Sequence, residues 1–294
     1  MSFNKKIINE NQTINLYEYS GSDLKCESFD IGDISLLDST SDKIRICFVD
    51  TETTGVHKEK DHIIEIALKC IEIDKHDGKN LKVLASYESL QDPGIPIPPE
   101  SMKIHEITDD DVKGHSINWN EVDDIFKVSQ LIVAHNAGFD RPFIEKHSMV
   151  SQKKIWACSV NDIDWMERGF KNKKQELLCI WHGFYYGSHR AMTDVDALIH
   201  LVSNPLYETD KPVVELVENA RNSWVKVYAY NSKISDKDLL KERFYRWDPN
   251  KRVWHKTIES DKRDEERDWL CDKIYDGNFM GQILEVLPVD KYKQ

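Results

Sequence analysis

The sequence predicts an α/β fold, in which helices flank a sheet, followed by a small α+β module toward the C-terminus. Three observations lead to this prediction. Strand-like apolar segments follow one another from Ile44, strand and helix patterns alternate between residues 131 and 204, and the composition changes near Asn204. Consecutive strands followed by alternating helices and strands are typical of a sheet with helices packed on it.

Three strands are predicted first. The apolar run from Ile44 to Val49 is typical of a buried strand, and the partly alternating segments 62–73 and 81–90 follow it after short polar turns. We expect these three strands to form a meander. The Pro-rich segment PGIPIPPE, residues 93–100, is predicted to be a loop.

Helices and strands alternate in the next part of the chain. Helical spacing appears in residues 118–129, 137–149, 160–169, 174–184 and 194–204, and the apolar segments LIVAHN (131–136) and KIWACS (154–159) are predicted as strands. Together these elements complete a first domain, predicted over residues 43–205. Residues 1–42 are polar and are expected to form an extension with little core of its own.

A second, smaller region is predicted over residues 206–294. Residues 204–212 have the composition of a linker, and a connecting helix is predicted from Val213 to Arg221. The segments 224–230, 236–244, 245–258 and 264–275 then indicate a strand–helix–strand–helix module.

Charge separates this module from the rest of the chain. The chain carries 40 Lys and Arg against 52 Asp and Glu, a net charge of -12, which argues against a protein that binds nucleic acid by overall charge. Residues 221–258 instead hold 10 Lys and Arg against 4 Asp and Glu, with Trp224, Trp247 and Trp254 among them. Trp247 and Trp254 could stack nucleic-acid bases, or they could form a small core beside solvated charges. The sequence leaves both interpretations open.

The cysteines and the apolar segments indicate the compartment. The six cysteines are widely spaced and form no CxxC pair, so we expect them to be reduced. The first residues, MSFNKKIINENQ, contain no apolar segment, and no apolar run approaches membrane-spanning length. The sequence therefore predicts a cytoplasmic protein with no membrane partner.

Acidic side chains stand where strands end and helices begin. Asp50 and Glu52 lie two residues apart at the end of the first strand, so their side chains point to the same face. Asp140 follows the strand 131–136, and Asp194 opens a predicted helix five residues after His189. Each acid also has a structural interpretation: Asp50 and Glu52 as a solvated strand end, and the other two as helix-start residues, with Thr193 as an N-cap for Asp194.

A metal centre would explain the four acids together. Clustered carboxylates raise one another's pKa, and bound divalent cations remove that cost. Oxygen ligands without cysteine favour Mg²⁺ or Mn²⁺. Two such ions roughly 4 Å apart can support displacement at a phosphodiester, with a histidine that titrates near neutrality accepting a proton from water.

Three motifs carry a resemblance to a known family. DTETTG, HNAGFD and HRAMTD resemble, in this order, the exonuclease motifs of DnaQ-like 3′–5′ exonucleases of the DEDDh type, with IHEIT between the first two. The resemblance extends over residues 45–202. The segment YRWDPNKRVWHK is also similar to the tail of bacterial stand-alone proteins that resemble the epsilon subunit of DNA polymerase III.

The resemblance implies an RNase H-like mixed sheet and a two-metal phosphodiester hydrolase. Such an enzyme would release nucleoside 5′-monophosphates from a 3′ end, in proofreading or repair. By motif position, the ligands of the two divalent cations would be Asp50, Glu52, Asp140 and Asp194, and the general base would be His189. Asp50 would lie between both ions, Glu52 and Asp194 would serve the ion that activates water, and Asp140 would serve the second ion.

Residues around these acids are candidate substrate contacts: Thr53, Thr54, Gly55, His105, Asn136 and Phe139. Alternatives remain for several of them. His105 and Phe139 could be core residues, Asn136 could hold its loop by hydrogen bonds, and Gly55 could only form a turn. Glu65, a carboxylate inside an apolar strand, is expected to hydrogen-bond the active-site loop. Glu106 stands where the family often has glycine.

The implied partner is a nucleic acid with a free 3′ end, with DNA favoured over RNA, and association with a DNA polymerase is left open. Two alternatives stay open as well. One is an RNA exonuclease of the same superfamily. The other is a catalytically silent module that binds nucleic acid or a polymerase, although the complete set of acids argues against it.

Overall fold

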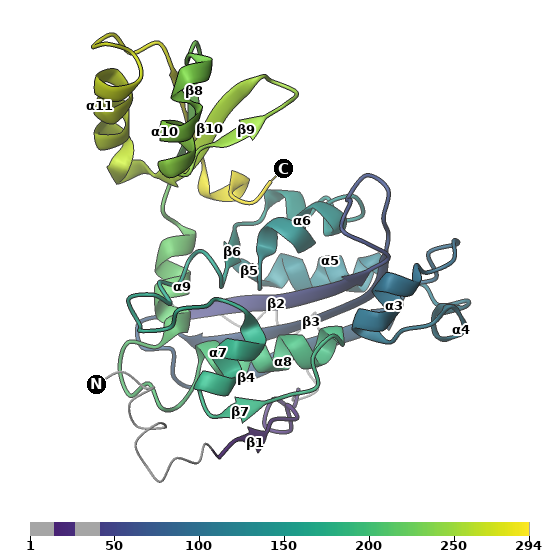
Figure 1. Cartoon of the computed structure of the whole chain (residues 1–294). Coiled ribbons are helices and arrows are strands. Elements are labelled where there is room, and N and C mark those ends of the chain that lie inside the picture. Colours follow the sequence, from purple (N-terminus) through teal and green to yellow (C-terminus); the bar gives the residue numbers. More distant parts are fainter. Residues whose placement is uncertain (1–14, 27–41, 294) are drawn as a thin grey trace. The chain divides into compact units, whose positions relative to one another are not determined.

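The computed structural model of the chain describes residues 15–26 and 42–293, and it contains two compact units (Figure 1). The first unit comprises Met1–Ala220 and Tyr292–Gln294, and the second comprises Arg221–Lys291. The first unit therefore continues past residue 205, where the sequence analysis places the domain boundary. Much of the predicted extension, residues 1–14 and 27–41, lies outside the described residues.

A five-stranded mixed sheet forms the centre of the first unit, in the order β4-β3-β2-β5-β6. The strands are β2 (Lys43–Thr53), β3 (Ile63–Asp74), β4 (Lys82–Leu90), β5 (Leu131–Ala134) and β6 (Trp156–Cys158). The pairs β2–β3 and β3–β4 are antiparallel, whereas β2–β5 and β5–β6 are parallel. The predicted mixed sheet is confirmed.

Helices cover both faces of this sheet (Figure 1). Along β2, Ile44, Ile46 and Phe48 belong to a core shared with α8 (Ala191–Val202), because alternate side chains of a strand point to the same face. Cys47 and Val49 belong to the opposite core, with α5 (Trp119–Val128) and α6 (Ala137–Ile144). Asp50 and Glu52 continue the first series, so their side chains lie on the α8 face.

The remaining helices of this unit are short. They are α3 (Pro99–His105), α4 (Asp109–Val112), η1 (Ser151–Lys153), α7 (Gln175–Trp181) and α9 (Pro212–Ala220). The Pro-rich loop expected over residues 93–100 is wrong at its end, because α3 begins at Pro99. Proline is accepted at this first helical position, where its missing N–H costs no hydrogen bond.

Several helix predictions in this unit are wrong in type or extent. Residues 160–169 form turns rather than a helix: the Asp164 carboxylate accepts hydrogen bonds from the backbone N–H groups of Met166 and Glu167, and Gly169, with a φ of 94°, ends the segment one turn later. The last predicted helix begins at Ala191 rather than at Asp194. Thr193 is therefore inside α8 and is not its N-cap; its hydroxyl donates to the carbonyl of Arg190.

The described part of the N-terminal extension packs against the domain. β1 (Tyr17–Glu18) pairs in parallel with β7 (Phe184–Tyr185), and Tyr19 and Leu24 belong to the core on the α8 face. The ammonium group of Lys69 hydrogen-bonds the Leu24 carbonyl and also forms a buried ion pair with Asp196. Residues 15–26 therefore contribute core contacts that the sequence analysis does not anticipate.

The second unit is a four-stranded antiparallel sheet with two α-helices and three short 3-10 helices. Its strands, in the order β11-β8-β10-β9, are β8 (Trp224–Ala229), β9 (Arg246–Asp248), β10 (Val253–Glu259) and β11 (Gln282–Val286), and its helices are η2 (Ile234–Asp236), α10 (Lys237–Glu242), η3 (Ser260–Lys262), α11 (Arg263–Lys273) and η4 (Pro288–Asp290). The predicted strand–helix–strand–helix order is incomplete. Residues 245–258 form a hairpin, and β11 follows α11.

The structure also bears on membrane insertion and cysteine state. Within the described ranges, every helix is too short or too polar to cross a membrane. Cys47, Cys70, Cys158 and Cys179 are buried free thiols.

Candidate active site

Three carboxylates meet at the end of the central strand. One oxygen from each of Asp50, Glu52 and Asp194 lies within 4.8 Å of the other two. Asp50 and Glu52 reach this point because β2 places them on the α8 face, and Asp194 reaches it from the first turn of α8. The three motif acids thus come together from segments more than 140 residues apart.

Asp140 lies beside this cluster but is held separately. It is 2% exposed, in the first turn of α6, and its Oδ1 accepts hydrogen bonds from the Thr51 backbone N–H at 3.1 Å and from the Thr51 hydroxyl at 2.8 Å. Asp140 is not one of the three mutually close acids. It is nevertheless the nearest electrostatic neighbour of Asp50, because after burial it has the largest effect on the pKa of Asp50.

Burial and mutual repulsion raise the pKa values of these carboxyl groups in the metal-free protein. Burial, followed by the charge of Asp140, raises the pKa of Asp50 well above its usual range. Burial, followed by the charge of Asp194, raises the pKa of Glu52 to about 8. Burial also raises the pKa of Asp140 to about 7, although hydrogen bonds from Thr51 lower it. The charge of Arg190 lowers the pKa of Glu52 but does not offset these effects.

The donor set fits a hard divalent cation. The three clustered ligands are carboxylate oxygens, with no cysteine or histidine among them. A cation bound here would remove the repulsion that raises the pKa values of these acids. The residues present thus match the type of metal that the sequence analysis predicts.

Backbone and phenol donors orient the Asp194 carboxylate. The Tyr186 hydroxyl donates to Oδ1 at 2.7 Å, and the backbone N–H groups of His189 and Arg190 donate to Oδ2 at 2.8 and 3.2 Å. Gln175 in turn donates to the Tyr186 hydroxyl at 2.9 Å. These contacts hold Asp194 at the start of α8 and connect it to the loop that carries His189.

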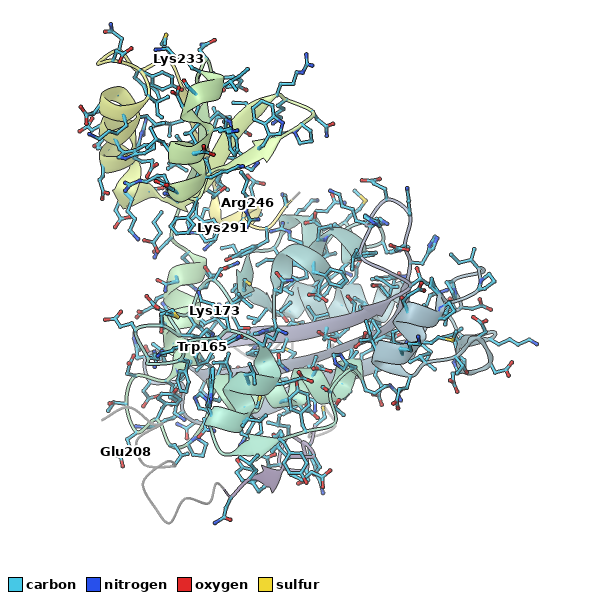
Figure 2. All side chains as sticks on the ribbon, in the orientation of Figure 1. Trp165, Lys173, Glu208, Lys233, Arg246 and Lys291 are labelled. Carbon is cyan, nitrogen blue, oxygen red and sulfur yellow. The ribbon has the colours of Figure 1, made fainter. Side chains whose placement is uncertain are left out.

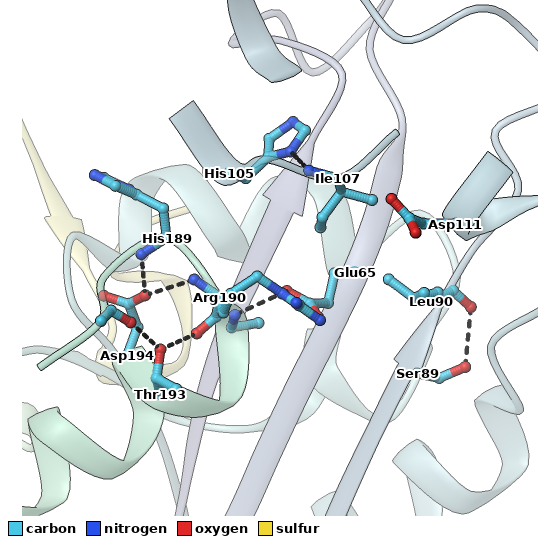
Figure 3. Close-up of polar contacts among 12 residues, drawn as sticks. Glu65, Ser89, Leu90, His105, Ile107, Asp111, His189, Arg190, Thr193 and Asp194 are labelled. Carbon is cyan, nitrogen blue, oxygen red and sulfur yellow. Dashed lines mark hydrogen bonds and ion pairs between the residues drawn. The ribbon is translucent and has the colours of Figure 1, made fainter. Parts of the chain in front are cut away.

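His189 occupies an accessible and strained position. Its φ is 68°, a left-handed conformation that residues other than glycine rarely adopt. Its side chain is 48% exposed, and Nε2 lies 3.7 Å from Oε1 of Glu176. Figure 3 shows the backbone N–H directed at Asp194 and the ring pointing away from it. The imidazole thus stands beside the cluster, in a loop that the acid itself helps to hold.

Glu65 and Arg190 support this loop. Glu65 is 5% exposed on β3, directly opposite Glu52 of β2, and its Oε1 accepts from Arg190 Nη2 at 2.8 Å (Figure 3). Its Oε2 accepts from the Ala191 backbone N–H at 2.9 Å. The sequence analysis anticipates the contact of Glu65 with the loop but overlooks Arg190. A signal was present, because a buried carboxylate requires a cationic or hydrogen-bonding partner.

The residues after Glu52 form a tightly bonded turn. Thr53 and Thr54 are buried; the Thr53 hydroxyl donates to the Gly55 carbonyl at 2.6 Å, and the Thr54 hydroxyl accepts from the His62 N–H at 3.0 Å. A Cβ at Gly55 would lie 2.5 Å from Oδ2 of Asp61. Only glycine fits there without displacing Asp61, so these three residues shape the loop next to the acids.

Asn136 and Phe139 line a hollow at the start of α6. The hollow has a volume of about 220 Å³, and the other residues that line it are Val56, Lys58, Gly138, Pro142 and Phe143. Asn136 has a left-handed backbone with a φ of 69°, and the rings of Phe139 and Phe143 are 5.3 Å apart. The turn after β2 and the start of α6 thus provide space for a small group beside Asp140.

His105 is separate from this hollow and is 2% exposed at the end of α3. Its Nδ1 accepts from the Ile107 backbone N–H at 3.0 Å, whereas its Nε2 is buried and has no hydrogen-bond partner among the described residues. The adjacent Glu106 has a φ of 59°, in the left-handed region that favours glycine. This backbone requirement explains why glycine suits the position. Glu106, Asp111 and Arg190 line a second hollow of about 290 Å³.

Fold and site together define a class of protein. A mixed sheet flanked by helices, with carboxylates gathered where the central strand ends and a helix begins, is the arrangement of an RNase H-like nuclease. A family model described as exonuclease matches residues 47–202, more than half of the chain. The chain belongs to this exonuclease family.

Individual proteins of related sequence are polymerase subunits or polymerases. The DNA polymerase III subunit epsilon of Treponema pallidum (strain Nichols) is 28% identical over 204 residues, which cover 66% of this chain and 92% of that protein. A PolC-type DNA polymerase III of Listeria innocua is 30% identical over 166 residues, which cover 53% of this chain. The chain spans only 11% of that much longer polymerase.

Solved structures also resemble the chain. A structure of exonuclease X in complex with 5′ overhanging duplex DNA has 23% identity and a TM-score of 0.45, covering 59% of this chain and 99% of that one. A zinc-bound complex of E. coli ExoI with single-stranded DNA has 16% identity and a TM-score of 0.49, covering 74% of this chain and 63% of that one.

Proposed function

We propose that the protein is a metal-dependent 3′–5′ exonuclease that removes nucleoside 5′-monophosphates from the 3′ end of a nucleic acid, with DNA favoured over RNA. The observation that carries this proposal is the convergence of Asp50, Glu52 and Asp194 in a member of the exonuclease family. Asp140 adjoins them and completes the four acids of the DEDDh motif pattern. A silent binding module would need none of these buried like charges.

Two divalent cations, Mg²⁺ or Mn²⁺, are the cofactors of the proposal. Glu52, Asp194 and Asp50 would hold one ion, and Asp50 and Asp140 would hold the second. When bound, such ions lower the pKa of an attacking water and stabilise the leaving oxygen. The hydrogen bonds from Thr51, Tyr186 and the loop backbone would keep Asp140 and Asp194 oriented toward their ligands.

His189 is the proposed general base. An imidazole nitrogen would accept a proton from the attacking water, which is the role of a general base. The ring is half exposed, so it can turn toward the acids without leaving a packed core. Arg190 and Glu65 would act as positioning residues, because they hold the backbone on the C-terminal side of His189.

The hollow at the start of α6 is the proposed site for part of the terminal nucleotide. Phe139 and Phe143 line this hollow with their rings, and Val56 and Lys58 of the turn after β2 line its other side. The unpartnered Nε2 of His105 would donate to an oxygen of the substrate. Because a similar protein is a subunit of DNA polymerase III, we extend the proposal to DNA as the substrate and to association with a DNA polymerase.

One gel experiment tests the hydrolysis itself, the end from which it proceeds and the preference for DNA or RNA. Strands of matched sequence, as DNA and as RNA, single- and double-stranded, are labelled at the 5′ or the 3′ end and incubated with Mg²⁺, Mn²⁺ or EDTA. We expect a ladder that shortens from the 3′ end, with labelled mononucleotide released from 3′-labelled DNA, and no reaction in EDTA. Faster loss of RNA would support the RNA exonuclease, and cleavage of neither polymer in either metal would revive the silent module.

A further inference from the structure

The second unit has a sheet face opposite the one that α10 and α11 cover, and at one end of it Lys291, which follows η4, lies over the ring of Trp224. Val225, Val227 and Ala229 of β8 form the core with α10 and α11, so the alternate residues Lys226 and Tyr228 point to the opposite face. In the antiparallel register, Tyr228 lies opposite His255 of β10, and His255 lies opposite Arg246 of β9. Arg246 is labelled in Figure 2. We call Lys226, Tyr228, Tyr230, Arg246, Lys251 and His255 the open face of this sheet.

Aromatic rings and cations alternate on the open face. The ammonium groups of Lys226 and Lys251 lie 5.6 and 5.1 Å from the centre of the Tyr228 ring. The rings of Tyr228 and Tyr230 are stacked with their centres 5.7 Å apart, and His255 is 6.1 Å from Tyr228. Tyr228 is only 4% exposed, whereas Tyr230 is partly exposed. Movement of the two flexible lysine side chains toward an anion would uncover more of this aromatic surface.

The cations of the open face have no carboxylate partners in the described part of the chain. None of the ion pairs found there includes Lys226, Arg246 or Lys251. By contrast, Arg243 and Lys256 both pair with the buried Glu266 of α11. Glu266 thus pairs with cations on the helix side, whereas the carboxylates on the other side are Asp248, which accepts from the hairpin turn, and Glu259, which pairs with Lys262.

The pKa of His255 is further evidence for a positive surface. Burial lowers the pKa of His255, and the charges of Lys226, Arg246 and Lys251 lower it further, against a single opposing carboxylate, Asp248. Asp248 itself is engaged by the backbone N–H groups of Asn250 and Lys251 in the hairpin turn. The Nδ1 of His255 is also buried without a hydrogen-bond partner among the described residues. The imidazole therefore lies in a field that attracts anions.

We propose that the open face binds a single-stranded nucleic acid. Lys226, Arg246 and Lys251 would contact phosphates, and Tyr228, Tyr230 and His255 would stack on bases. Proteins that bind single strands combine these two kinds of contact, a cationic groove along the backbone and aromatic rings under the bases. The inference goes beyond the proposed function, because it assigns a second nucleic-acid contact to a unit outside the exonuclease domain.

The tryptophans that the sequence analysis considers for stacking lie on the opposite face of this sheet. Trp247 and Trp254 lie opposite each other in the register, and Trp254 lies opposite Ala229, so both are on the helix side. Trp254 packs against the core of this unit, and Trp247 meets its ring edge to face at 5.5 Å. Their surface is therefore separate from the open face.

A binding assay without metal tests the proposal apart from catalysis. Fluorescence anisotropy of a labelled oligothymidylate of about 20 nucleotides is measured with the full chain in EDTA, across a range of salt concentrations. The variant Lys226→Gln/Arg246→Gln/Lys251→Gln should weaken binding by about 10-fold or more at low salt. The slope of the logarithm of the affinity against the logarithm of the salt concentration should become shallower by about 2, as expected for three lost phosphate contacts. A matched uridine strand determines whether the face accepts RNA as well.

The control variant removes the same charge elsewhere in the unit. Lys237→Gln, Lys241→Gln and Lys273→Gln lie on α10 and α11, and together they should change the affinity by less than about 3-fold. Equal weakening by the control, or undiminished binding by the open-face variant, would overturn the proposal. So would equally tight binding of a polyglutamate peptide of the same charge, because such a ligand offers no bases to stack.

Photocrosslinking tests the stacking contact directly. A strand that contains 5-iodouracil is irradiated with the full chain, and the crosslinked peptides are identified by mass spectrometry. We expect crosslinks at Tyr228, Tyr230 or His255, and those at Tyr230 and His255 should be lost in Tyr230→Ala/His255→Ala. Crosslinks confined to the first unit would contradict the proposal, whatever the nuclease activity of the protein.

Discussion

Glu65 of β3 and Arg190 of the loop before α8 form a bidentate ion pair. Arg190 Nη2 is 2.8 Å and Nε is 3.1 Å from Oε1 of Glu65, and the backbone N–H of Arg190 donates to Asp194 at 3.2 Å. The same short loop thus connects the sheet, a cluster acid and His189. Bidentate pairs of this kind fix orientation as well as distance.

The first prediction concerns this pair. In Glu65→Gln, the charge-assisted contact with Arg190 weakens and the loop loses its fixed position, while the fold is kept. We expect kcat to fall by about 10- to 100-fold, with a smaller change in KM, because misplacing a catalytic group affects the chemical step more than binding. Steady-state kinetics on a 3′-labelled strand separates the two constants.

Glu72→Gln is the matched control. Glu72 is a second buried carboxylate on β3, and it pairs with Arg45 at 3.2 Å and Lys43 at 3.3 Å. Its loss should lower the free energy of unfolding, as breaking a buried pair does, without a selective loss of kcat. Equal kinetic effects in the two variants would mean that Glu65 acts only through stability.

The second prediction concerns His189. His189→Ala should lower kcat by about 10²- to 10⁴-fold, the usual contribution of a general base, while the affinity for Mn²⁺ measured by calorimetry stays within about 3-fold. His76→Ala, at an exposed turn between β3 and β4, should leave both values unchanged. Loss of metal binding in His189→Ala would instead make this residue a ligand.

The third prediction is a pH dependence of stability in the metal-free protein. Glu52 has its pKa raised to about 8 and Asp140 to about 7, so the folded state holds protons that the unfolded state releases. The stability that Glu52 contributes is therefore greatest below its unfolded pKa of 4.5 and is lost as the pH rises toward its folded pKa of about 8. For Asp140 the corresponding pKa values are 3.8 in the unfolded state and about 7 in the folded state. We expect urea unfolding in EDTA to show a loss on the order of 2 kcal/mol between pH 5 and pH 8.

Mg²⁺ should restore this stability, and more at pH 8 than at pH 5, because bound cations replace the protons. The variant Glu52→Gln should flatten the pH dependence in EDTA. A metal-free protein whose stability rises between pH 5 and pH 8 would contradict the assignment of a protonated acid cluster.

The fourth prediction concerns Glu106. A left-handed backbone costs a residue other than glycine roughly 1–2 kcal/mol, whereas glycine loses about 0.5–1 kcal/mol more entropy on folding. Glu106→Gly should therefore raise the free energy of unfolding by about 0.5 kcal/mol, measured by urea denaturation. Lys103→Gly, inside the helix α3 that Glu106 follows, should lower the free energy of unfolding by about 1 kcal/mol. Destabilisation by both substitutions would show that φ does not limit stability at residue 106.

Local patterns predict much of the fold and of the acid cluster. The apolar run before Asp50 identifies the central strand, and the two-residue period of a strand places Asp50 and Glu52 on one face. Three motifs in order then indicate which distant acid joins them. The turn at residues 160–169 is different, because Gly169 adopts a φ of 94° and ends after one turn a helix that the residue spacing alone favours.

Contacts that depend on strand register are harder to predict. Arg190 becomes important only because β3 places Glu65 opposite Glu52, next to the start of α8. In the second unit, register separates Trp254 from Tyr228 and so decides which aromatic rings face the helices. No short segment contains this information, because it arises when strands far apart in sequence pair.

The rate of mononucleotide release by Asp50→Asn tests the central claim most directly. Asparagine keeps the shape of Asp50 but removes its charge, so the variant should fold while the proposed ions lose the ligand between them. We predict that release from a 3′-labelled DNA strand in Mg²⁺ falls by at least about 10³-fold, as expected when metal-assisted stabilisation of the transition state is removed, while the thermal unfolding midpoint in EDTA does not fall. Undiminished release by the purified variant would contradict the assignment of this acid cluster as the metal centre of the exonuclease.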